Sequence, residues 1–451
     1  MRLFGTDGIR GVAGRFPLDE QTVTIIGRSL ALNLARDLGR PARIVIGRDT
    51  RESGPQIELA VGRGLASAGA TARSAGVITT PGVAYITRSE PFDAGVVISA
   101  SHNPYQDNGI KIFSRSGKKI GDETERRIEA DVASGAAVDD WGGATGWLRD
   151  QADTEKEFPE RYVSYLADEV GSGLRLEGLK LGLDCANGAA SHIAPKLFER
   201  LGGRVEVIGA KPDGRNINEG CGSLHLESLQ RVVEERGLNL GIAFDGDADR
   251  ALFVDEAGKI VDGDAALLIL ADKLRAQGLL AGNVVVATVM SNLGLELALK
   301  ERDIQLVRAQ VGDRYVLEEL LARGAKLGGE QSGHIIFPDI SLAGDGMITA
   351  IQLLGAIKRS GQTLGQLASQ LTRYPQVLVN VRVQSKPRLD SIPEIKAEME
   401  RIEREMDGRG RLLVRYSGTE NLARVMIEGE SERKISEQAN QLAELIHHKL
   451  G

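Results

Sequence analysis

Short runs of Val, Ile and Leu alternate with helical stretches along most of this 451-residue chain. Residues 43–47 have the composition of a buried strand, and a helix is expected after it, over about residues 53–68. Ser53 and Gln56 have the spacing of a capping box for that helix. Further strands are expected at 180–184, 240–244 and 283–289. β-branched runs separated by helices are typical of parallel sheets covered by crossover helices, so the sequence predicts an α/β protein.

The order of elements changes after Tyr374-Pro375. From there the expected order is strand, charged helix, strand, strand and final helix. Two helices beside a small antiparallel sheet form an α+β arrangement, which differs from what precedes it. At 451 residues the chain is long enough for several domains, and four are expected. They cover residues 1–150, 151–255, 256–372 and 373–451.

Charge and cysteine content exclude several classes of function. The net charge is −7, so no overall positive field favours a polyanion, and no nucleic-acid partner is expected. The chain has two cysteines and no CxxC motif, which argues against a disulfide framework and a thiolate zinc site and favours a reducing cytosol. The most apolar window, Leu280–Leu299, is interrupted by polar residues, so no membrane span is expected.

The first candidate site is Ser101, which comes just after an apolar run at 94–99. Pro104 biases the residue before it away from the helical region, so the chain turns sharply and presents the serine at a strand end. A serine placed there can act as a nucleophile. A Ser-His pair in a turn is also ordinary turn chemistry, and no Gly-x-Ser-x-Gly elbow surrounds it to support acyl transfer.

Lys111 lies among apolar neighbours on a strand expected at 108–113. Its stem can lie along apolar surface with the ammonium in water. Alternatively, burial beside a reactive hydroxyl would lower the pKa of Lys111 toward that of a usable base.

Residues 245–250, Asp-Gly-Asp-Ala-Asp-Arg, form the second candidate site. Three carboxylates spaced two residues apart repel one another unless a cation lies among them, and such hard oxygen ligands suit Mg²⁺. An EF-hand does not fit, because Arg250 and Gly258 stand where its Gly and Glu are required. A solvated acidic turn and a phosphatase with an aspartyl nucleophile remain alternatives.

Two further loops have ligand-binding features. Residues 415–421, followed by Arg424, combine two arginines, two hydroxyls and a glycine, as a phosphate cradle requires; a polar hairpin is the alternative. Residues 328–334 combine glycines, which allow close approach to a ligand, with Glu330 and Ser332, which offer the acceptor and donor that sugar hydroxyls need. A plain connecting turn is the alternative for this loop.

Taken together and in this order, four motifs resemble the α-D-phosphohexomutase superfamily. They are Ala-Ser-His-Asn-Pro at 100–104, Asp-Gly-Asp-Ala-Asp-Arg at 245–250, Gly-Glu-Gln-Ser-Gly-His at 329–334 and Arg-Tyr-Ser-Gly-Thr-Glu at 415–420. The resemblance covers nearly the whole chain. Three more segments look like the bacterial phosphoglucosamine mutase branch of that superfamily. They are residues 4–11, 216–225 and 311–316.

The resemblance implies three successive α/β mixed-sheet domains plus a C-terminal α+β domain around a central cleft, which carry the phosphoserine, metal-binding, sugar-binding and phosphate-binding loops in that order. It implies a cytoplasmic mutase, perhaps better described as an isomerase, that interconverts glucosamine 6-phosphate and glucosamine 1-phosphate through a phosphoserine and a bisphosphate. Glucosamine 1,6-bisphosphate or glucose 1,6-bisphosphate would prime it, and its product would feed UDP-N-acetylglucosamine and cell-wall synthesis. A homodimer is also implied. Phosphomannomutase or phosphoglucomutase activity is the alternative, and a non-catalytic sugar-phosphate sensor a more remote one.

The resemblance also implies roles for individual residues. Ser101 matches the serine that carries the phosphoryl group. The Mg²⁺ ligands would be Asp245, Asp247, Asp249 and the oxygen of phosphorylated Ser101. Around the transferring phosphoryl group would lie Arg10, His102 and Lys111, with Lys111 as the general base. The sugar would be bound by Gly312, Asp313, Glu330 and Ser332, and its phosphate by Arg415, Ser417, Gly418, Thr419 and Arg424. Asn421 departs from the proline common at its position in relatives, which puts the stiffness of that loop in question.

Overall fold

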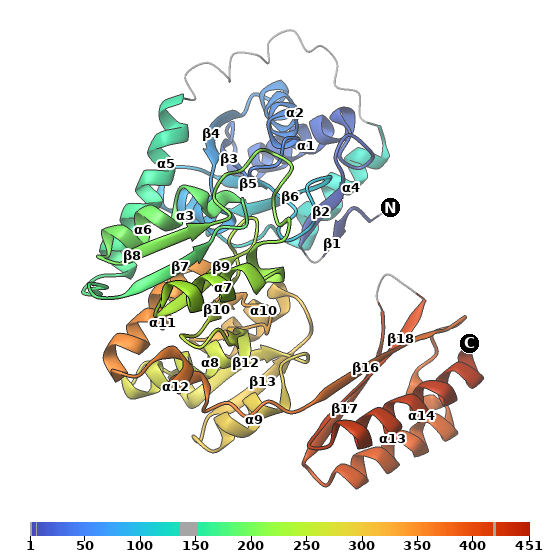
Figure 1. Ribbon diagram of the computed structural model, residues 1–451. Coiled ribbons are helices and arrows are strands. Elements are labelled where there is room, and N and C mark those ends of the chain that lie inside the picture. Colours follow the sequence, from blue (N-terminus) through green and yellow to red (C-terminus); the bar gives the residue numbers. More distant parts are fainter. Residues whose placement is uncertain (1, 6, 136–151, 418–420) are drawn as a thin grey trace. The chain divides into compact units, whose positions relative to one another are not determined.

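The computed structural model describes residues 2–5, 7–135, 152–417 and 421–451. The domain boundary expected at residue 150 therefore lies outside the described residues. The chain divides into two compact units (Figure 1). Unit 1 consists of Met1–Met290 and Val307–Ser369, and unit 2 consists of Ser291–Leu306 and Gln370–Gly451.

The first sheet of unit 1 has six strands in the order β1-β2-β6-β5-β3-β4. β3 pairs in parallel with β4 and β5, whereas β6 pairs antiparallel with β5 and β2, so the sheet is mixed. Its strands are β1 (Phe4–Gly5), β2 (Gly8–Val12), β3 (Arg43–Arg48), β4 (Thr71–Val77), β5 (Ala94–Ile98) and β6 (Asp107–Ser114). The helices of this region are α1 (Glu20–Leu38), α2 (Gly54–Ser67), α3 (Thr80–Ser89) and α4 (Asp122–Ala133).

The start of α2 corrects one expectation. Ser53 is the N-cap residue, but its backbone is helical and its side chain makes no capping hydrogen bond. Its hydroxyl instead accepts a hydrogen bond from the Asn108 side-chain amide. The predicted capping box is therefore wrong, because a tertiary contact uses the hydroxyl that the local pattern had assigned to the helix end.

The second sheet has the order β11-β10-β9-β7-β8, and the third has the order β13-β12-β14-β15. The strands expected at 180–184 and 240–244 are confirmed as β7 (Lys180–Asp184) and β9 (Leu240–Phe244). The other strands are β8 (Arg204–Ile208), β10 (Ala251–Val254), β11 (Ile260–Val261), β12 (Val284–Thr288), β13 (Gln305–Ala309), β14 (Gly328–Gly329) and β15 (Ile335–Ile336). The helices are α5 (Ala152–Ser164), α6 (Ala194–Arg200), α7 (Glu227–Arg236), α8 (Gly263–Ala276), α9 (Leu293–Lys300), α10 (Asp313–Arg323), α11 (Gly346–Ser360) and α12 (Leu364–Ala368).

Unit 2 contains an antiparallel sheet in the order β16-β18-β17, together with α9. Its strands and remaining helices are β16 (Gln376–Arg382), α13 (Pro393–Met406), β17 (Gly410–Tyr416), β18 (Leu422–Gly429) and α14 (Glu432–Leu450). Alternate residues of β18, including Val425 and Ile427, are fully buried in a core that Ile395 and Leu442 also enter. The two helices cover one face of the sheet (Figure 1), which confirms the α+β arrangement expected for this region.

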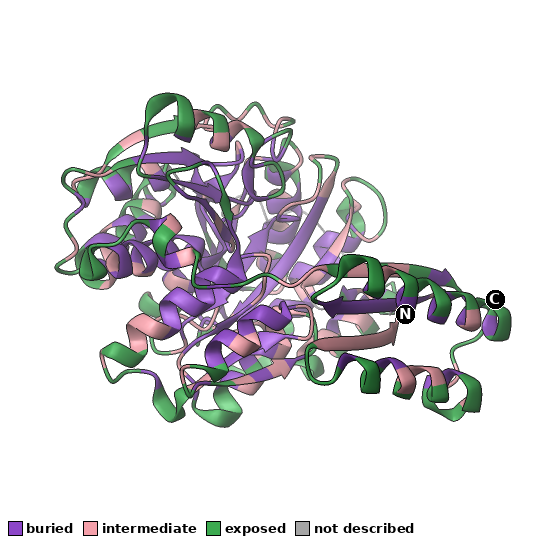
Figure 2. Ribbon diagram, turned by 60° about the horizontal axis from the view of Figure 1, so that its bottom comes forward, coloured by how far each residue is buried: buried purple, intermediate pink, exposed green. Residues whose placement is uncertain are grey.

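Burial follows the pattern that crossover connections require. Figure 2 shows buried strands inside unit 1, and exposed residues gathered on the outer surfaces of its helices. β5 and β9 are buried along their whole length, as expected for strands covered on both faces. Within the described part of the chain, no helix is long and apolar enough to cross a membrane.

Helix α11 begins at a buried N-cap, Asp345. Its carboxylate accepts hydrogen bonds from the Met347 and Ile348 amides and, at 2.5 Å, from the Tyr162 hydroxyl. Burial raises the pKa of Asp345 to about 6, although these hydrogen bonds act in the opposite direction. The folded state therefore holds a proton on Asp345 more tightly than the unfolded state does.

We expect Asp345→Asn, which mimics the protonated acid, to gain stability relative to the wild type as pH rises. A raised carboxyl pKa favours folding below the unfolded value near 4, and that contribution is lost as pH rises toward 6. The full effect is about 3 kcal/mol. Thermal unfolding midpoints of both proteins at pH 4.5 and 7.5 measure it. A gap between the midpoints that does not change with pH would contradict this expectation.

Candidate active site

Ser101 lies in the loop between β5 and β6, where the strand ends at Ile98. It is buried, and its φ of 53° is unusual for a residue that is not glycine. Its Oγ lies 2.5 Å from Asp245 Oδ2 and 3.2 Å from His102 Nδ1. Ser99 is also buried, but its hydroxyl donates to Asp49 and accepts from the Ser101 amide. The structure thus directs Ser101, and not Ser99, toward the acidic loop.

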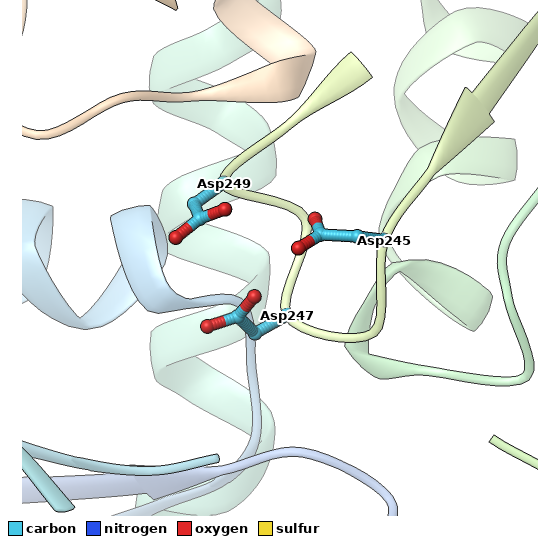
Figure 3. Close-up of side chains that lie close together, drawn as sticks. All are labelled: Asp245, Asp247 and Asp249. Carbon is cyan, nitrogen blue, oxygen red and sulfur yellow. The ribbon is translucent and has the colours of Figure 1, made fainter. Parts of the chain in front are cut away.

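The acidic loop connects β9 to β10, and the carboxylates of Asp245, Asp247 and Asp249 point toward one another (Figure 3). One ligand atom from each lies within 4.8 Å of the others. Among the described residues, Asp247 Oδ1 and Asp249 Oδ1 are buried and accept no hydrogen bond. Burial, followed by the charges of Asp249 and Asp247, raises the pKa of Asp245 well above its ordinary value. Unsatisfied buried carboxylate oxygens in this number fit a hard divalent cation such as Mg²⁺.

Lys111 corrects a second expectation. Its Nζ lies 2.9 Å from Asp247, 3.1 Å from Asp7 and 3.2 Å from Asp249. Burial by itself would lower the pKa of Lys111, but these three carboxylates raise it well above its ordinary value. Lys111 is therefore an ammonium ion at neutral pH. The expectation that burial would make it a usable base is wrong, because burial brings the lysine into contact with acids as well as away from water.

Arg10 and His102 lie on the two sides of Ser101. Arg10 donates to the Asp7 carboxylate at 2.5 Å and to the Asn103 side chain at 3.3 Å. Burial, together with the positive charges of Arg250 and Arg10, lowers the pKa of His102 to about 4. At neutral pH His102 is thus uncharged, and its Nδ1 lies close enough to Ser101 Oγ to exchange a hydrogen bond with it.

The loops expected to bind the sugar meet at a cavity of about 400 Å³. Glu330 accepts hydrogen bonds from the Gly312 amide at 3.1 Å and from the Ser332 hydroxyl at 3.2 Å. Asp313 is held at 2.6 Å by Lys119. The residues that line the cavity include Asp7, Arg10, His102, Asp249, Arg250, Gly312, Asp313, Glu330 and His334. The structure thus brings candidates from three expected domains to one cavity of unit 1.

Unit 2 carries the candidates for a phosphate-binding loop. Arg415 and Arg424 lie directly opposite each other on β17 and β18. Burial and the charge of Arg424 lower the pKa of Arg415. The Ser417 carbonyl accepts a hydrogen bond from Lys386. Gly418 and Thr419 lie outside the described residues. Like charges directly opposite on neighbouring strands are destabilising by themselves, and a bound anion would relieve the repulsion.

The sequence did not single out several buried polar residues at this site. His334 Nδ1 lies 3.6 Å from Asp249; burial would lower the pKa of His334, but the charges of Asp249 and Asp313 raise it to about 9. Lys119 bridges Asp7 and Asp313 at 2.6 Å each. Arg51 is fully buried beneath the Ser101 loop. His334 lies in a motif that the sequence did mark, whereas nothing in the sequence signals the burial of Lys119 and Arg51.

Profiles of four domain families match the chain in order. They are described as phosphoglucomutase/phosphomannomutase alpha/beta/alpha domain I, at residues 1–139; domain II, at 160–258; domain III, at 262–374; and the C-terminal domain, at 378–445.

Among curated proteins, a phosphoglucosamine mutase of Solibacter usitatus is 49% identical over 100% of this chain and 99% of its own length. A phosphoglucosamine mutase of Syntrophotalea carbinolica is 48% identical, over 100% and 98%. The chain belongs to the phosphoglucosamine mutase family. It is a mutase, an enzyme of the isomerase class, and its three α/β domains and C-terminal α+β domain are those of the phosphoglucomutase/phosphomannomutase architecture.

Solved structures share the fold of this phosphoglucosamine mutase family member. A phosphoglucomutase/phosphomannomutase family protein from Burkholderia thailandensis gives a TM-score of 0.79 at 23% identity, over 98% of this chain and 96% of that one. N-acetylphosphoglucosamine mutase from Aspergillus fumigatus, in complex with GlcNAc-6P and magnesium, gives 0.69 at 18% identity, over 100% and 96%. The same fungal enzyme has a structure with glucose 1,6-bisphosphate.

We expect Asp247→Asn to weaken Mg²⁺ binding at least about tenfold, because cation affinity follows the number of charged ligands. The melting temperature in metal-free buffer should change little, since the lost attraction to Lys111 is offset by relief of carboxylate repulsion. Calorimetric titration with MgCl₂ measures the first effect. Asp255→Asn, which removes another buried carboxylate near the end of β10, is the matched control. Equal Mg²⁺ affinity in wild type and Asp247→Asn would show that the acidic loop is not a metal site.

Proposed function

We propose that this enzyme interconverts glucosamine 6-phosphate and glucosamine 1-phosphate through phosphorylated Ser101 and a glucosamine 1,6-bisphosphate intermediate. The observation that carries the proposal is the 2.5 Å contact between Ser101 Oγ and Asp245, within a buried cluster of three carboxylates. A serine nucleophile beside a candidate Mg²⁺ site is suited to accept and return a phosphoryl group. The names of the full-length relatives support the amino sugar as substrate.

Asp245, Asp247 and Asp249, with an oxygen of phosphorylated Ser101, are the proposed ligands of one Mg²⁺. When bound, the ion would offset the charge of the phosphoryl group and of the carboxylates. Two buried oxygens without hydrogen-bond partners among the described residues, on Asp247 and Asp249, support this assignment.

The protein groups around Ser101 have separate tasks in this proposal. Arg10 and the Lys111 ammonium attract the oxygens of the moving phosphoryl group, as charge neutralisation in phosphoryl transfer requires. His102 is neutral, lies 3.2 Å from Ser101 Oγ, and can accept the hydroxyl proton. Lys111 contributes charge in this scheme and does not act as a base.

Two phosphate sites are needed, because the bisphosphate has to turn over between the two transfers. Ser101 is the reactive site. The fixed phosphate is proposed to bind at the loop of unit 2, through Arg415, Ser417, Gly418, Thr419 and Arg424. The repulsion between the opposed arginines supports this role, since a phosphate dianion would neutralise both.

The sugar is proposed to bind in the cavity of unit 1, with Gly312, Asp313, Glu330 and Ser332 around it. Glu330 is held by two hydrogen bonds, so its carboxylate is fixed at the cavity wall. A fixed carboxylate attracts the ammonium group at C2 of glucosamine, which glucose and mannose lack. The primer is proposed to be glucosamine 1,6-bisphosphate or glucose 1,6-bisphosphate, and the location cytoplasmic, in keeping with the two free, buried cysteines. A homodimer stays a prediction.

The test is the ratio of kcat/KM values for glucosamine, glucose and mannose 1-phosphates on one preparation primed with glucose 1,6-bisphosphate. Glucosamine 1-phosphate should be preferred by roughly ten- to a hundredfold, the value of about one charge-assisted hydrogen bond. Ser101→Ala should abolish turnover of all three, because the nucleophile has no substitute. A preference for glucose or mannose phosphate would reject the amino sugar, and an active Ser101→Ala would reject the phosphoserine.

We expect Arg415→Ala and Arg424→Ala to raise KM for both glucosamine monophosphates by roughly tenfold or more. A fixed phosphate is bound equally in the ground and transition states, so its loss affects KM before kcat. Initial rates in both directions measure this. Arg409→Ala, which removes an exposed arginine just before β17, is the control and should leave KM unchanged. Unchanged KM in both test variants would place the fixed phosphate elsewhere.

A further inference from the structure

Arg51 is buried beneath the loop that carries Ser101, and its side chain has no exposed surface. Its Nε donates to Asp49 Oδ2 at 2.9 Å. Its two terminal nitrogens donate to four backbone carbonyls of the Ser101 loop. These carbonyls belong to Ser101, at 2.9 Å; Asn103, at 2.8 Å; Pro104, at 2.5 Å; and Asp107, at 3.0 Å. These five contacts match the five N–H donors that a guanidinium possesses.

The same network reaches the other side of the Ser101 peptide. The Ser101 amide donates to Ser99 Oγ at 2.9 Å, and Ser99 in turn donates to Asp49 Oδ2 at 2.6 Å. Asp49 is the carboxylate that pairs with Arg51. The Asn218 side chain adds donors to the carbonyls of Ser101 and Asn103, at 2.9 and 3.1 Å. Both the N–H and the C=O of the serine are therefore held by buried side chains.

Ser101 needs such support, because its left-handed backbone conformation costs about 1 kcal/mol or more and persists only where the surroundings enforce it. Without these contacts the loop would relax, and Oγ would move away from Asp245. A displacement of about 1 Å at a reacting atom can reduce a rate by about a hundredfold.

We propose that Arg51 is the positioning residue that sets Ser101 Oγ in line with the acidic loop for phosphoryl transfer. This inference rests on the proposed function. Arg51 acts through the loop backbone and does not touch the reacting atoms. Its task requires arginine, because lysine has three donors and no planar fork, and at most three of the five acceptors could keep a partner.

The test compares Arg51→Lys with Arg48→Lys. Arg48 pairs with Glu58 at 2.9 Å in the same region of unit 1 and is largely buried, so it is a control for losing an arginine ion pair away from the loop. We expect Arg51→Lys to reduce kcat by about 30- to 100-fold with KM within about twofold. Arg48→Lys should lower the melting temperature and leave kcat within about twofold. Equal kcat values for the two variants, at the same folded fraction, would overturn the proposal.

A second readout separates this inference from the proposed function. Intact mass after incubation with glucose 1,6-bisphosphate follows a gain of ~80 Da, one phosphoryl group. Wild type should gain it quickly and Arg51→Lys slowly. Wild type that never gains it overturns the proposed function and this inference with it, whereas equal rates in both proteins overturn the inference alone.

If Arg51→Lys does not fold, Asn218→Ala decides. Its side chain holds two of the carbonyls that Arg51 holds, and it belongs to a different segment of the chain. We expect a loss of about fivefold or more in kcat and in the rate of phosphorylation, with KM and melting temperature little changed. Wild-type rates for Asn218→Ala would then overturn the proposal.

Discussion

A buried balance between carboxylates and cations is the constraint on which the site of unit 1 depends. Asp245, Asp247 and Asp249 are withdrawn from water on one short loop. Charges that close interact strongly in a medium of low dielectric constant, so they persist only with partners or with shifted pKa values. Lys111 is the central partner, with ion pairs to Asp247, Asp249 and Asp7.

This balance is uneven, and the unevenness has a chemical consequence. Burial would raise the pKa of Asp249, but Lys111 and His334 bring it well below its ordinary value. Asp245 receives less compensation and its pKa is raised. The carboxylate that contacts Ser101 is therefore the one that most needs a further positive charge. A divalent cation at this point would satisfy Asp245 and the negative charge of a phosphorylated serine together.

Close backbone contacts between loops make the balance geometrically possible. A Cβ on Gly246 would lie 2.5 Å from the Ser101 carbonyl oxygen, so only glycine lets the acidic loop approach the serine loop this closely. A Cβ on Gly346, at the start of α11, would lie 2.5 Å from the Arg250 carbonyl oxygen. The Gly346 amide donates to Ala248 at 3.1 Å. The acidic loop is thus held between the serine loop and the N-terminus of α11.

The amino-acid sequence by itself determined the alternation of strands and helices, the α+β change after residue 374, and the motifs around Ser101 and Asp245, because these depend on local composition and spacing. Only the tertiary structure decided the charge of Lys111, the use of the Ser53 hydroxyl and the burial of Arg51. Each of these depends on which groups meet from segments far apart in the chain. A pKa or a hydrogen bond is set by those neighbours in space, and local periodicity carries no information about them.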